Sequence, residues 1–365
     1  MSSAQDRLAQ LRDEIDRLDG EIMNLISARA RCAQEVAEVK MADNPGEPVF
    51  FYRPEREAQV LRRVKDQNPG PLAGEEMARL FREIMSACLA LEKPMHIAFL
   101  GPAGTFTQAA ALKHFGHSVV SVPLSAIDTV FREVESGAAH YGVVPVENST
   151  EGMVNHTLDM FMTSPLKICG EVQLRIHHHL LVAPEHRDQP LQKIYSHQQS
   201  LAQCRQWLDS NRQGVERVAV SSNAEAARRA AAEPGTAAIA GDMAAERYGL
   251  AYLASNIEDR PDNTTRFLII GREDVPASGV DKSSILVSMR NKPGALYQLL
   301  EPFHRHGISL TRLETRPSLS GTWAYVFFID FEGHANDPKV QTVLAEVEAS
   351  AFELKRLGSY PVGVL

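Results

Sequence analysis

The sequence predicts a multidomain chain with three successive folds: an all-α three-helix segment, a two-lobed α/β segment and a small α+β segment. The first ninety or so residues carry helical periodicity with few helix breakers. The middle alternates short strand and helix patterns, and the last part follows the order strand, helix, strand, strand, helix, strand. We expect these segments to span residues 1–93, 95–272 and 283–365.

The composition excludes several classes of function. Of the 365 residues, 44% are hydrophobic and 23% are charged, which is ordinary for a globular protein. The net charge of −8, without a basic block, argues against nucleic acid as a partner. There is no apolar run of membrane-spanning length and no signal-peptide pattern, so we expect no membrane partner and a cytoplasmic protein. The four cysteines form no CxxC pair, which is typical of reduced thiols.

The first helix carries a heptad seam. A helix of roughly 35–40 residues is about 55 Å long, too long for one small globule to cover, so we expect the seam to pack on a second chain in a dimer. Apolar residues recur along it at alternating spacings of three and four: Leu8, Leu11, Ile15, Leu18, Ile22 and Leu25.

Two cations interrupt this seam. Arg29 and Lys40 share one helix face at roughly 100° per residue. Cations in an apolar seam need an anion between them, unless they extend to the surface or pair with Glu35 or Glu38; both interpretations stay open. Arg12 points about 100° away and could serve a site in the partner chain.

Two more helices are expected, at about 54–64 and 74–92, with Arg56 and Glu57 in the first turn of the former. The stretch 11–16, the two seam cations and Arg56-Glu57 resemble the all-helical chorismate mutase family. The resemblance implies a dimer whose first helices cross between subunits, and a rearrangement that needs no nucleophile. The residues it implies are Arg12 (from the partner), Arg29 and Arg56 on the substrate carboxylates, Lys40 on the ether oxygen and Glu57 on the ring hydroxyl.

Two positions depart from that family pattern. Arg53 stands where some members have Asp, and Glu92 stands where many have a Gln that shares the ether oxygen with Lys40. An ionised Glu cannot donate a hydrogen bond. Glu92 must therefore be protonated at work or leave the task to Lys40, so we expect its pKa to be raised and activity to fall as pH rises through it.

The middle segment places polar groups at the ends of expected strands. A strand at 96–101 leads through a Gly-rich turn into a helix at 109–115, and such a helix start offers free N–H groups to an anion, although a plain turn is the alternative. A strand at 141–146 ends in Glu147-Asn148-Ser149, a position that marks binding sites in open α/β sheets. The run 263–267 suits an anion-binding, proton-donating pocket, or a loop whose Thr side chains cap the backbone.

Other motifs point away from metals and cofactors. His177, His178 and His179 fall in a strand expected at 176–182, where neighbours point to opposite faces and cannot converge on one ion. Ser196 precedes a helix expected at 201–208 and could cap it. Neither nucleotide-binding glycine motif is present, so no cofactor is predicted.

Together these middle stretches, in order over about 95–271, resemble the prephenate dehydratase family. The resemblance implies a fold like a type II periplasmic binding protein, with the site in the interlobe cleft. It implies that Thr265 assists departure of the ring hydroxyl as water while carbon dioxide leaves; for Arg266 a structural role is the alternative. The implied substrate-binding residues are Thr105, Glu147, Asn148, Ser149, Ser196, Gln198, Thr264, Arg266 and Phe267.

The C-terminal segment is expected to be βαββαβ. Its stretches 291–296 and 314–317 resemble the ACT regulatory domain, which implies phenylalanine binding between two such domains and feedback inhibition; the alternative is a domain that only dimerises. The residues implied are Asn291, Gly294, Ala295, Leu296, Glu314, Thr315 and Arg316.

The three resemblances together cover nearly the whole chain and match the P-protein family, a mutase joined to a dehydratase. They imply the substrates chorismate and prephenate, the effector L-phenylalanine, and a homodimer or higher homo-oligomer. Two alternatives remain: a non-catalytic amino-acid sensor and a dehydratase that prefers arogenate.

Overall fold

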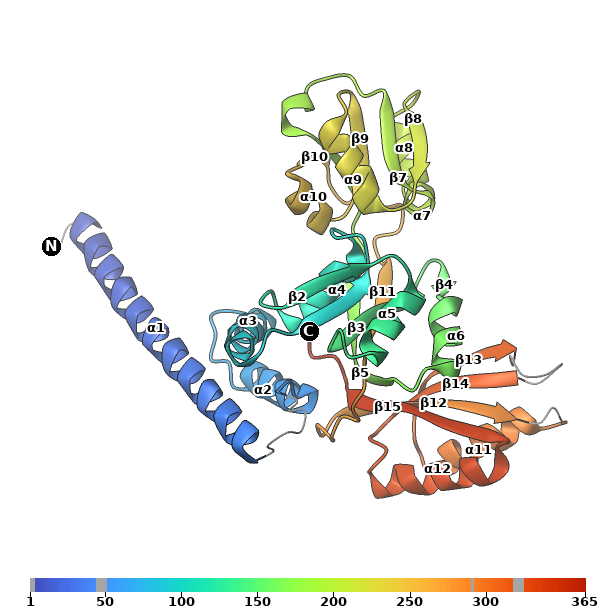
Figure 1. Cartoon of the computed structure of the whole chain (residues 1–365). Coiled ribbons are helices and arrows are strands. Elements are labelled where there is room, and N and C mark those ends of the chain that lie inside the picture. The colour runs from blue at the N-terminus through green and yellow to red at the C-terminus, as the bar shows by residue number, and fades with distance from the viewer. Residues whose placement is uncertain (1–3, 44–50, 290–291, 318–324) are drawn as a thin grey trace.

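The computed structural model describes residues 4–43, 51–289, 292–317 and 325–365. Within these ranges the chain forms a helical segment, two α/β lobes and a C-terminal sheet covered by two helices (Figure 1). This is the order of folds that the sequence predicted, and that prediction is confirmed.

The helical segment consists of α1 (Ala4–Asp43), α2 (Pro54–Asp66) and α3 (Gly74–Glu92). Proline suits the first position of α2, because its φ is already helical and the N–H that it lacks would have no helical acceptor. Helix α1 extends away from the rest of the chain, and Ala37 is its one buried residue (Figure 1). The predicted seam residues Leu8, Leu11, Ile15, Leu18, Ile22 and Leu25 are 42% to 70% exposed in the single chain.

The first lobe is a six-stranded sheet in the order β2-β1-β3-β11-β5, with β4 paired to β3. Strand β11 enters antiparallel between β3 and β5, although it comes from the far end of the α/β segment. Helices α4, α5 and α6 pack on this sheet. The elements are β1 (His96–Leu100), α4 (Phe106–Phe115), β2 (Val120–Leu124), α5 (Ile127–Glu135), β3 (Tyr141–Asn148), β4 (Gly152–Met153), α6 (Asn155–Thr163), β5 (Lys167–Arg175) and β11 (Thr264–Gly271).

The second lobe is a five-stranded sheet in the order β10-β6-β9-β7-β8. The chain enters it after β5 and leaves it before β11, so two backbone crossings join the lobes (Figure 1). Its elements are β6 (His179–Val182), the 3-10 helix η1 (Pro184–His186), β7 (Lys193–His197), α7 (Gln198–Gln203), α8 (Arg205–Asn211), β8 (Glu216–Val220), α9 (Asn223–Ala232), β9 (Thr236–Ala240), α10 (Asp242–Tyr248) and β10 (Ala251–Ala254).

Three expectations about this lobe were wrong in detail. Strand β6 begins at His179, so His177 and His178 lie in the crossing between the lobes and not in a strand. The two segments that cross between the lobes are hydrogen-bonded to each other there, because Ile257 N donates to His178 O at 2.8 Å. The helix expected at 201–208 is two short helices, and His197, not Ser196, caps α7.

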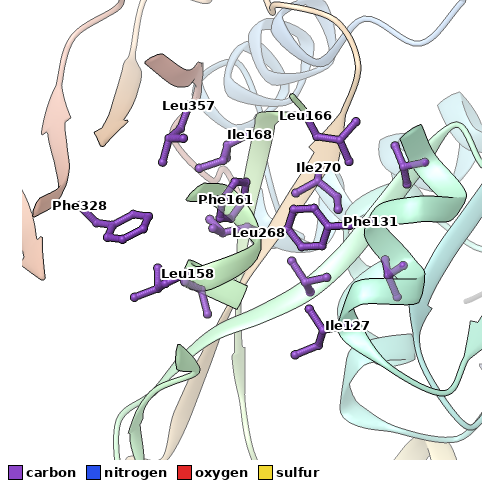
Figure 2. Packing of buried hydrophobic residues seen from close by; sticks show 14 of the residues in the cluster. Ile127, Phe131, Leu158, Phe161, Leu166, Ile168, Leu268, Ile270, Phe328 and Leu357 are labelled. Carbon is purple, nitrogen blue, oxygen red and sulfur yellow. The ribbon is translucent and has the colours of Figure 1, made fainter. Parts of the chain in front are cut away.

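The C-terminal sheet has the order β13-β14-β12-β15. One face packs on α11 and α12, and the other face joins the core of the first lobe. Figure 2 shows Phe328 and Leu357 of this sheet beside Leu158 and Ile168 of the lobe. The elements are β12 (Asp281–Met289), α11 (Ala295–Arg305), β13 (Leu310–Pro317), β14 (Tyr325–Glu332), α12 (Pro338–Ser350) and β15 (Glu353–Pro361).

A glycine makes this close packing possible. Gly358 has φ +146, and a Cβ at that position would lie 2.4 Å from the carbonyl oxygen of Ile168 in β5. A side chain there would push β15 away from the first lobe, because the obstacle is backbone and cannot rotate aside.

We therefore expect Gly358→Ala to lower the free energy of unfolding by about 2–3 kcal/mol. The measurement is the urea concentration at the midpoint of unfolding of the C-terminal sheet and the first lobe, taken on the full chain. Gly363→Ala is the matched control, because its nearest neighbour, Glu171 O, is 3.6 Å from the added Cβ. Equal midpoints for the two variants would contradict the packing argument.

Candidate functional site

A cleft of about 640 Å³ lies between the two lobes. The N-termini of α4 and α9 and the ends of β3 and β11 open on it. Among the described residues that line it there is no lysine or arginine. Its polar lining consists of hydroxyl, amide and imidazole groups, one carboxylate and helix N-termini, so an anion in it would be held by N–H and O–H donors.

Thr265 and Asn148 meet at the floor of this cleft. They are directly opposite each other in the pairing of β11 with β3. Asn148 Nδ2 donates a hydrogen bond to Thr265 Oγ1 at 2.8 Å. Because the threonine oxygen accepts from the amide, its own hydrogen can be given to a group in the cleft, and the amide can stabilise negative charge on that oxygen.

Asn263 holds this pair from behind. Its side-chain oxygen accepts from Asn148 Nδ2 at 3.0 Å and from the Thr150 hydroxyl at 3.2 Å. Its amide donates to Gln203 Oε1 of α7 at 3.1 Å, and His178 Nε2 lies 2.8 Å from the same oxygen. The network therefore connects the floor of the first lobe to a helix of the second.

The environment of His178 in this network favours the neutral imidazole. Burial lowers its pKa, and the contact with Gln203 offsets this only in part. A neutral imidazole that donates from Nε2 to Gln203 leaves Nδ1 as an acceptor, and that buried atom has no hydrogen-bond partner in the described chain. No sequence motif pointed to Gln203, and His178 was considered there only as a metal ligand.

Three of the predicted cleft residues besides Thr265 line the cleft: Thr105, Asn148 and Phe267. Thr105 stands at the N-cap of α4, and its hydroxyl donates to Leu100 O at 3.2 Å. Phe267 is two residues after Thr265 on the same strand, so both point to the same side.

Four other predicted residues lie beside the cleft and not among its lining. Ser196 is fully buried and donates to Ile239 O at 2.8 Å. Ser149 Oγ accepts from the backbone N–H of Thr264 at 2.9 Å, which fastens the β3 end to the β11 start. Gln198 is replaced in the lining by its neighbour Gln199.

Arg266 and Glu147 point away from the cleft, so their expected contact with a ligand there is corrected. Successive side chains in a strand face opposite sides of the sheet. Arg266 is next to Thr265, and Glu147 is next to Asn148, so both charged side chains face away from the cleft. Arg266 Nη1 pairs with Asp330 at 2.7 Å, and Glu147 pairs with Arg312 at 2.6 Å. Both partners belong to the C-terminal sheet.

In the helical segment, Arg29 and Lys40 of α1 act electrostatically on Glu92 at the end of α3. Partial burial raises the pKa of Glu92, and the charges of Lys40 and Arg29 oppose that rise. The net direction is upward. Lys40 Nζ also lies 5.9 Å from the ring centre of Phe51.

The remaining residues predicted for the helical site are not gathered around Glu92. Arg56 is exposed, and Arg12 lies in the outer half of α1. Glu57 is turned to the boundary with the first lobe, where it pairs with Arg82 of α3 at 3.2 Å. Burial raises the pKa of Glu57, and Arg82 opposes the rise. In the single chain the carboxylate of Glu57 is therefore engaged by Arg82.

A smaller pocket of about 280 Å³ lies at the start of α11. Gly294 caps this helix with φ +79, a conformation that suits glycine. Gly294, Ala295 and Leu296 line the pocket, while Glu314 and Thr315 lie on edge strand β13. Arg316 is occupied by Asp159 of α6 at 2.7 Å, and Asn291 lies outside the described residues.

The described ranges contain no group of three or more His, Cys, Asp or Glu side chains that could hold a metal ion. They also contain no helix that is long and apolar enough to cross a membrane.

Three family models match the chain in succession. Chorismate mutase type II matches residues 11–93, prephenate dehydratase matches 97–275, and the ACT domain matches 283–349.

Relatives match over the full length. A bifunctional chorismate mutase/prephenate dehydratase of Stutzerimonas stutzeri is 64% identical over 364 residues, covering 100% of both chains. One of Pseudomonas aeruginosa is 63% identical over 99% of both chains. The solved structure of prephenate dehydratase from Arthrobacter aurescens in complex with L-Phe is 35% identical, covers 73% of this chain and 90% of that one, and has a TM-score of 0.68.

Proposed function

The chain belongs to the family of bifunctional chorismate mutase/prephenate dehydratases, and from this premise we propose which residues carry its two reactions. The enzyme rearranges chorismate to prephenate and then converts prephenate to phenylpyruvate with loss of carbon dioxide and water. We assign the mutase to 1–93, the dehydratase to 95–272 and the regulatory ACT domain to 283–365.

The dehydratase reaction takes place in the interlobe cleft, with Thr265 as the proton donor. The bond between the ring and its carboxylate breaks, and its electron pair moves into the ring. The ring hydroxyl leaves with the proton of Thr265 as water, and the ring becomes aromatic. The observation that carries this assignment is the 2.8 Å bond from Asn148, which stabilises the threonine oxygen while it is deprotonated. The proton is then restored from solvent.

The two carboxylates of prephenate are bound without a cationic side chain. The N-termini of α4 and α9, with Thr105 and Ser222 at their caps, face the cleft and offer backbone N–H donors. Ser149 and Thr264 support these contacts by fixing the strand ends, and Ser196 does so from the second lobe. Gln198, at the start of α7, remains a proposed substrate-binding residue.

The mutase site is completed by a second copy of the chain. Arg29, Lys40 and Glu92 supply one side, and the exposed seam of α1 brings Arg12 of the partner subunit to it. Arg56 turns toward the substrate in the dimer. Glu57 remains with Arg82, so the ring hydroxyl is left to other groups.

Phenylalanine inhibits the dehydratase by binding the ACT domain at the α11 pocket, where Gly294, Ala295 and Leu296 receive its carboxylate on backbone N–H groups. Glu314 and Thr315 of a partner's β13 bind its amino group. The protein works in the cytoplasm as a homodimer or a larger homo-oligomer, with prephenate and not arogenate as its substrate, because a mutase that makes prephenate is on the same chain.

The test of the function supplies purified protein with chorismate and follows prephenate and phenylpyruvate, with and without phenylalanine. We expect phenylpyruvate to form and to fall when phenylalanine is added. Thr265→Ala should lower dehydratase kcat by at least about a thousandfold with mutase activity intact, so prephenate accumulates. Equal loss of both activities would indicate misfolding, and full dehydratase activity would refute the role of Thr265.

The second prediction concerns pH. Because burial raises the pKa of Glu92, its proton is present below that pKa and is lost above it, so mutase activity should fall as pH rises through a range above the usual carboxyl value. Glu92→Gln keeps a donor at all pH values and should flatten the profile between pH 5 and about 8. An unchanged pH profile in this variant would contradict the proposal.

The third prediction concerns the dimer. Ile15→Glu with Ile22→Glu places charges in the exposed seam and should lower mutase activity by about a hundredfold, with dehydratase activity within about twofold. Light scattering should show a smaller particle. Asn24→Glu, outside the seam, is the matched control, and a mutase that survives the double substitution would exclude a shared site.

A further inference from the structure

Each of the two side chains that meet in the cleft has a charged neighbour in the sequence that faces the opposite side of the sheet. Thr265 and Asn148 point into the cleft, while Arg266 and Glu147 point to the ACT sheet. The two charged residues are also opposite each other in the pairing of β11 with β3. The backbone at the reacting hydroxyl is thus anchored on its far side by the regulatory domain.

The anchor of Arg266 is buried and fully bonded. Its Nε donates to Glu171 at 2.8 Å, its Nη1 to Asp330 at 2.7 Å and its Nη2 to the Tyr360 hydroxyl at 3.1 Å. Tyr360 lies 2.9 Å from the Ser284 hydroxyl, which donates to the second oxygen of Asp330 at 2.6 Å. Asp330, Ser284 and Tyr360 lie on three strands of the ACT sheet, so Arg266 is fixed to the sheet and not to one loop.

The anchor of Glu147 is more open. Arg312 of edge strand β13 pairs with it at 2.6 Å, with 14% of the arginine side chain and 40% of the glutamate side chain exposed. Arg312 also contacts the sulfur of Met153, which lines the cleft. A shift of β13 would therefore act on the residue next to Asn148 and on the cleft wall.

The same ACT strands reach the α11 pocket. Strand β14 carries Asp330 of the anchor and Phe327 of the pocket, three residues apart, or roughly 10 Å along a strand. Strand β12 carries Ser284 of the anchor and Met289 of the pocket, five residues apart. Two continuous strands thus join the pocket to the groups that hold Arg266.

We propose that Arg266 and Glu147 are positioning residues, which hold Thr265 and Asn148 in register through their ion pairs with Asp330 and Arg312 of the ACT sheet. Movement of that sheet displaces the hydroxyl from the leaving group, and this is how occupation of the α11 pocket lowers turnover. The second part rests on the proposed inhibition by phenylalanine.

The test uses the full chain with two ACT-side variants, Arg312→Gln and Asp330→Asn, which leave every cleft residue in place. Asp159→Asn is the matched control, because it removes another ion pair of β13, that of Arg316, whose partner helix α6 carries no reacting group. Dehydratase kcat and KM, mutase activity, the phenylalanine concentration for half-inhibition and phenylalanine binding by calorimetry are measured for each.

We expect both test variants to lower dehydratase kcat at least about fivefold with KM within about twofold, and to raise the half-inhibiting phenylalanine concentration about tenfold while phenylalanine still binds. Mutase activity should stay unchanged in both test variants. The control variant Asp159→Asn should keep the wild-type dehydratase kcat, KM and half-inhibiting phenylalanine concentration. Arg312→Glu should behave like Arg312→Gln, and adding Glu147→Arg should restore coupling by reversing the pair.

Wild-type kcat and inhibition in both test variants would overturn the proposal, as would equal effects in the control. Should the unmodified protein neither bind phenylalanine nor respond to it, the proposed inhibition fails, and the kcat comparison alone then decides the positioning role. Arg312 is partly exposed, so its variants remain informative where the buried Asp330 variant does not fold.

Discussion

One buried arginine determines how the α/β lobe and the regulatory sheet fit together. Arg266 is 8% exposed and is bonded by Glu171 from its own lobe and by Asp330 and Tyr360 from the ACT sheet. Lys282 of β12 also pairs with Glu171, at 2.7 Å, so two cations and two carboxylates balance. Removing one partner of such a buried set costs about 3–5 kcal/mol, so this set keeps the ACT sheet joined to the lobe.

Because side chains alternate along a strand, one face of β11 lines the cleft and the other face contacts the ACT sheet. Thr265 and Phe267 face the cleft, and Arg266 between them faces the ACT sheet. The described residues that line the cleft therefore include no arginine, and the donors that the cleft offers to an anion are N–H and O–H groups at helix N-termini and strand ends. Such fixed dipoles need little reorganisation when charge moves from the departing carboxylate into the ring.

The sequence predicted the order of the folds, the long seam and the strand ends that carry Thr265 and Asn148, because periodicity and strand-end polarity are local signals. It could not predict where Arg266 points, since its partner Asp330 is 64 residues away and belongs to another domain. The role of Glu57 in the mutase site was expected from the family resemblance, and the sequence did not show that tertiary packing pairs it with Arg82. Gln203 and His178 join the cleft only because the lobes close over Asn263.

Arg82 also connects the helical segment to a helix that borders the interlobe cleft. Its Nη1 donates to Lys113 O, one of the last carbonyls of α4, at 2.8 Å. A cation at the C-terminus complements the dipole of a helix whose N-terminus, with Thr105, faces the cleft. Glu57 accepts from the same guanidinium and balances its buried charge. The helical segment thereby contacts α4 at one end while the other end of α4 borders the cleft, and the pairing of Glu57 with Arg82 is part of that contact.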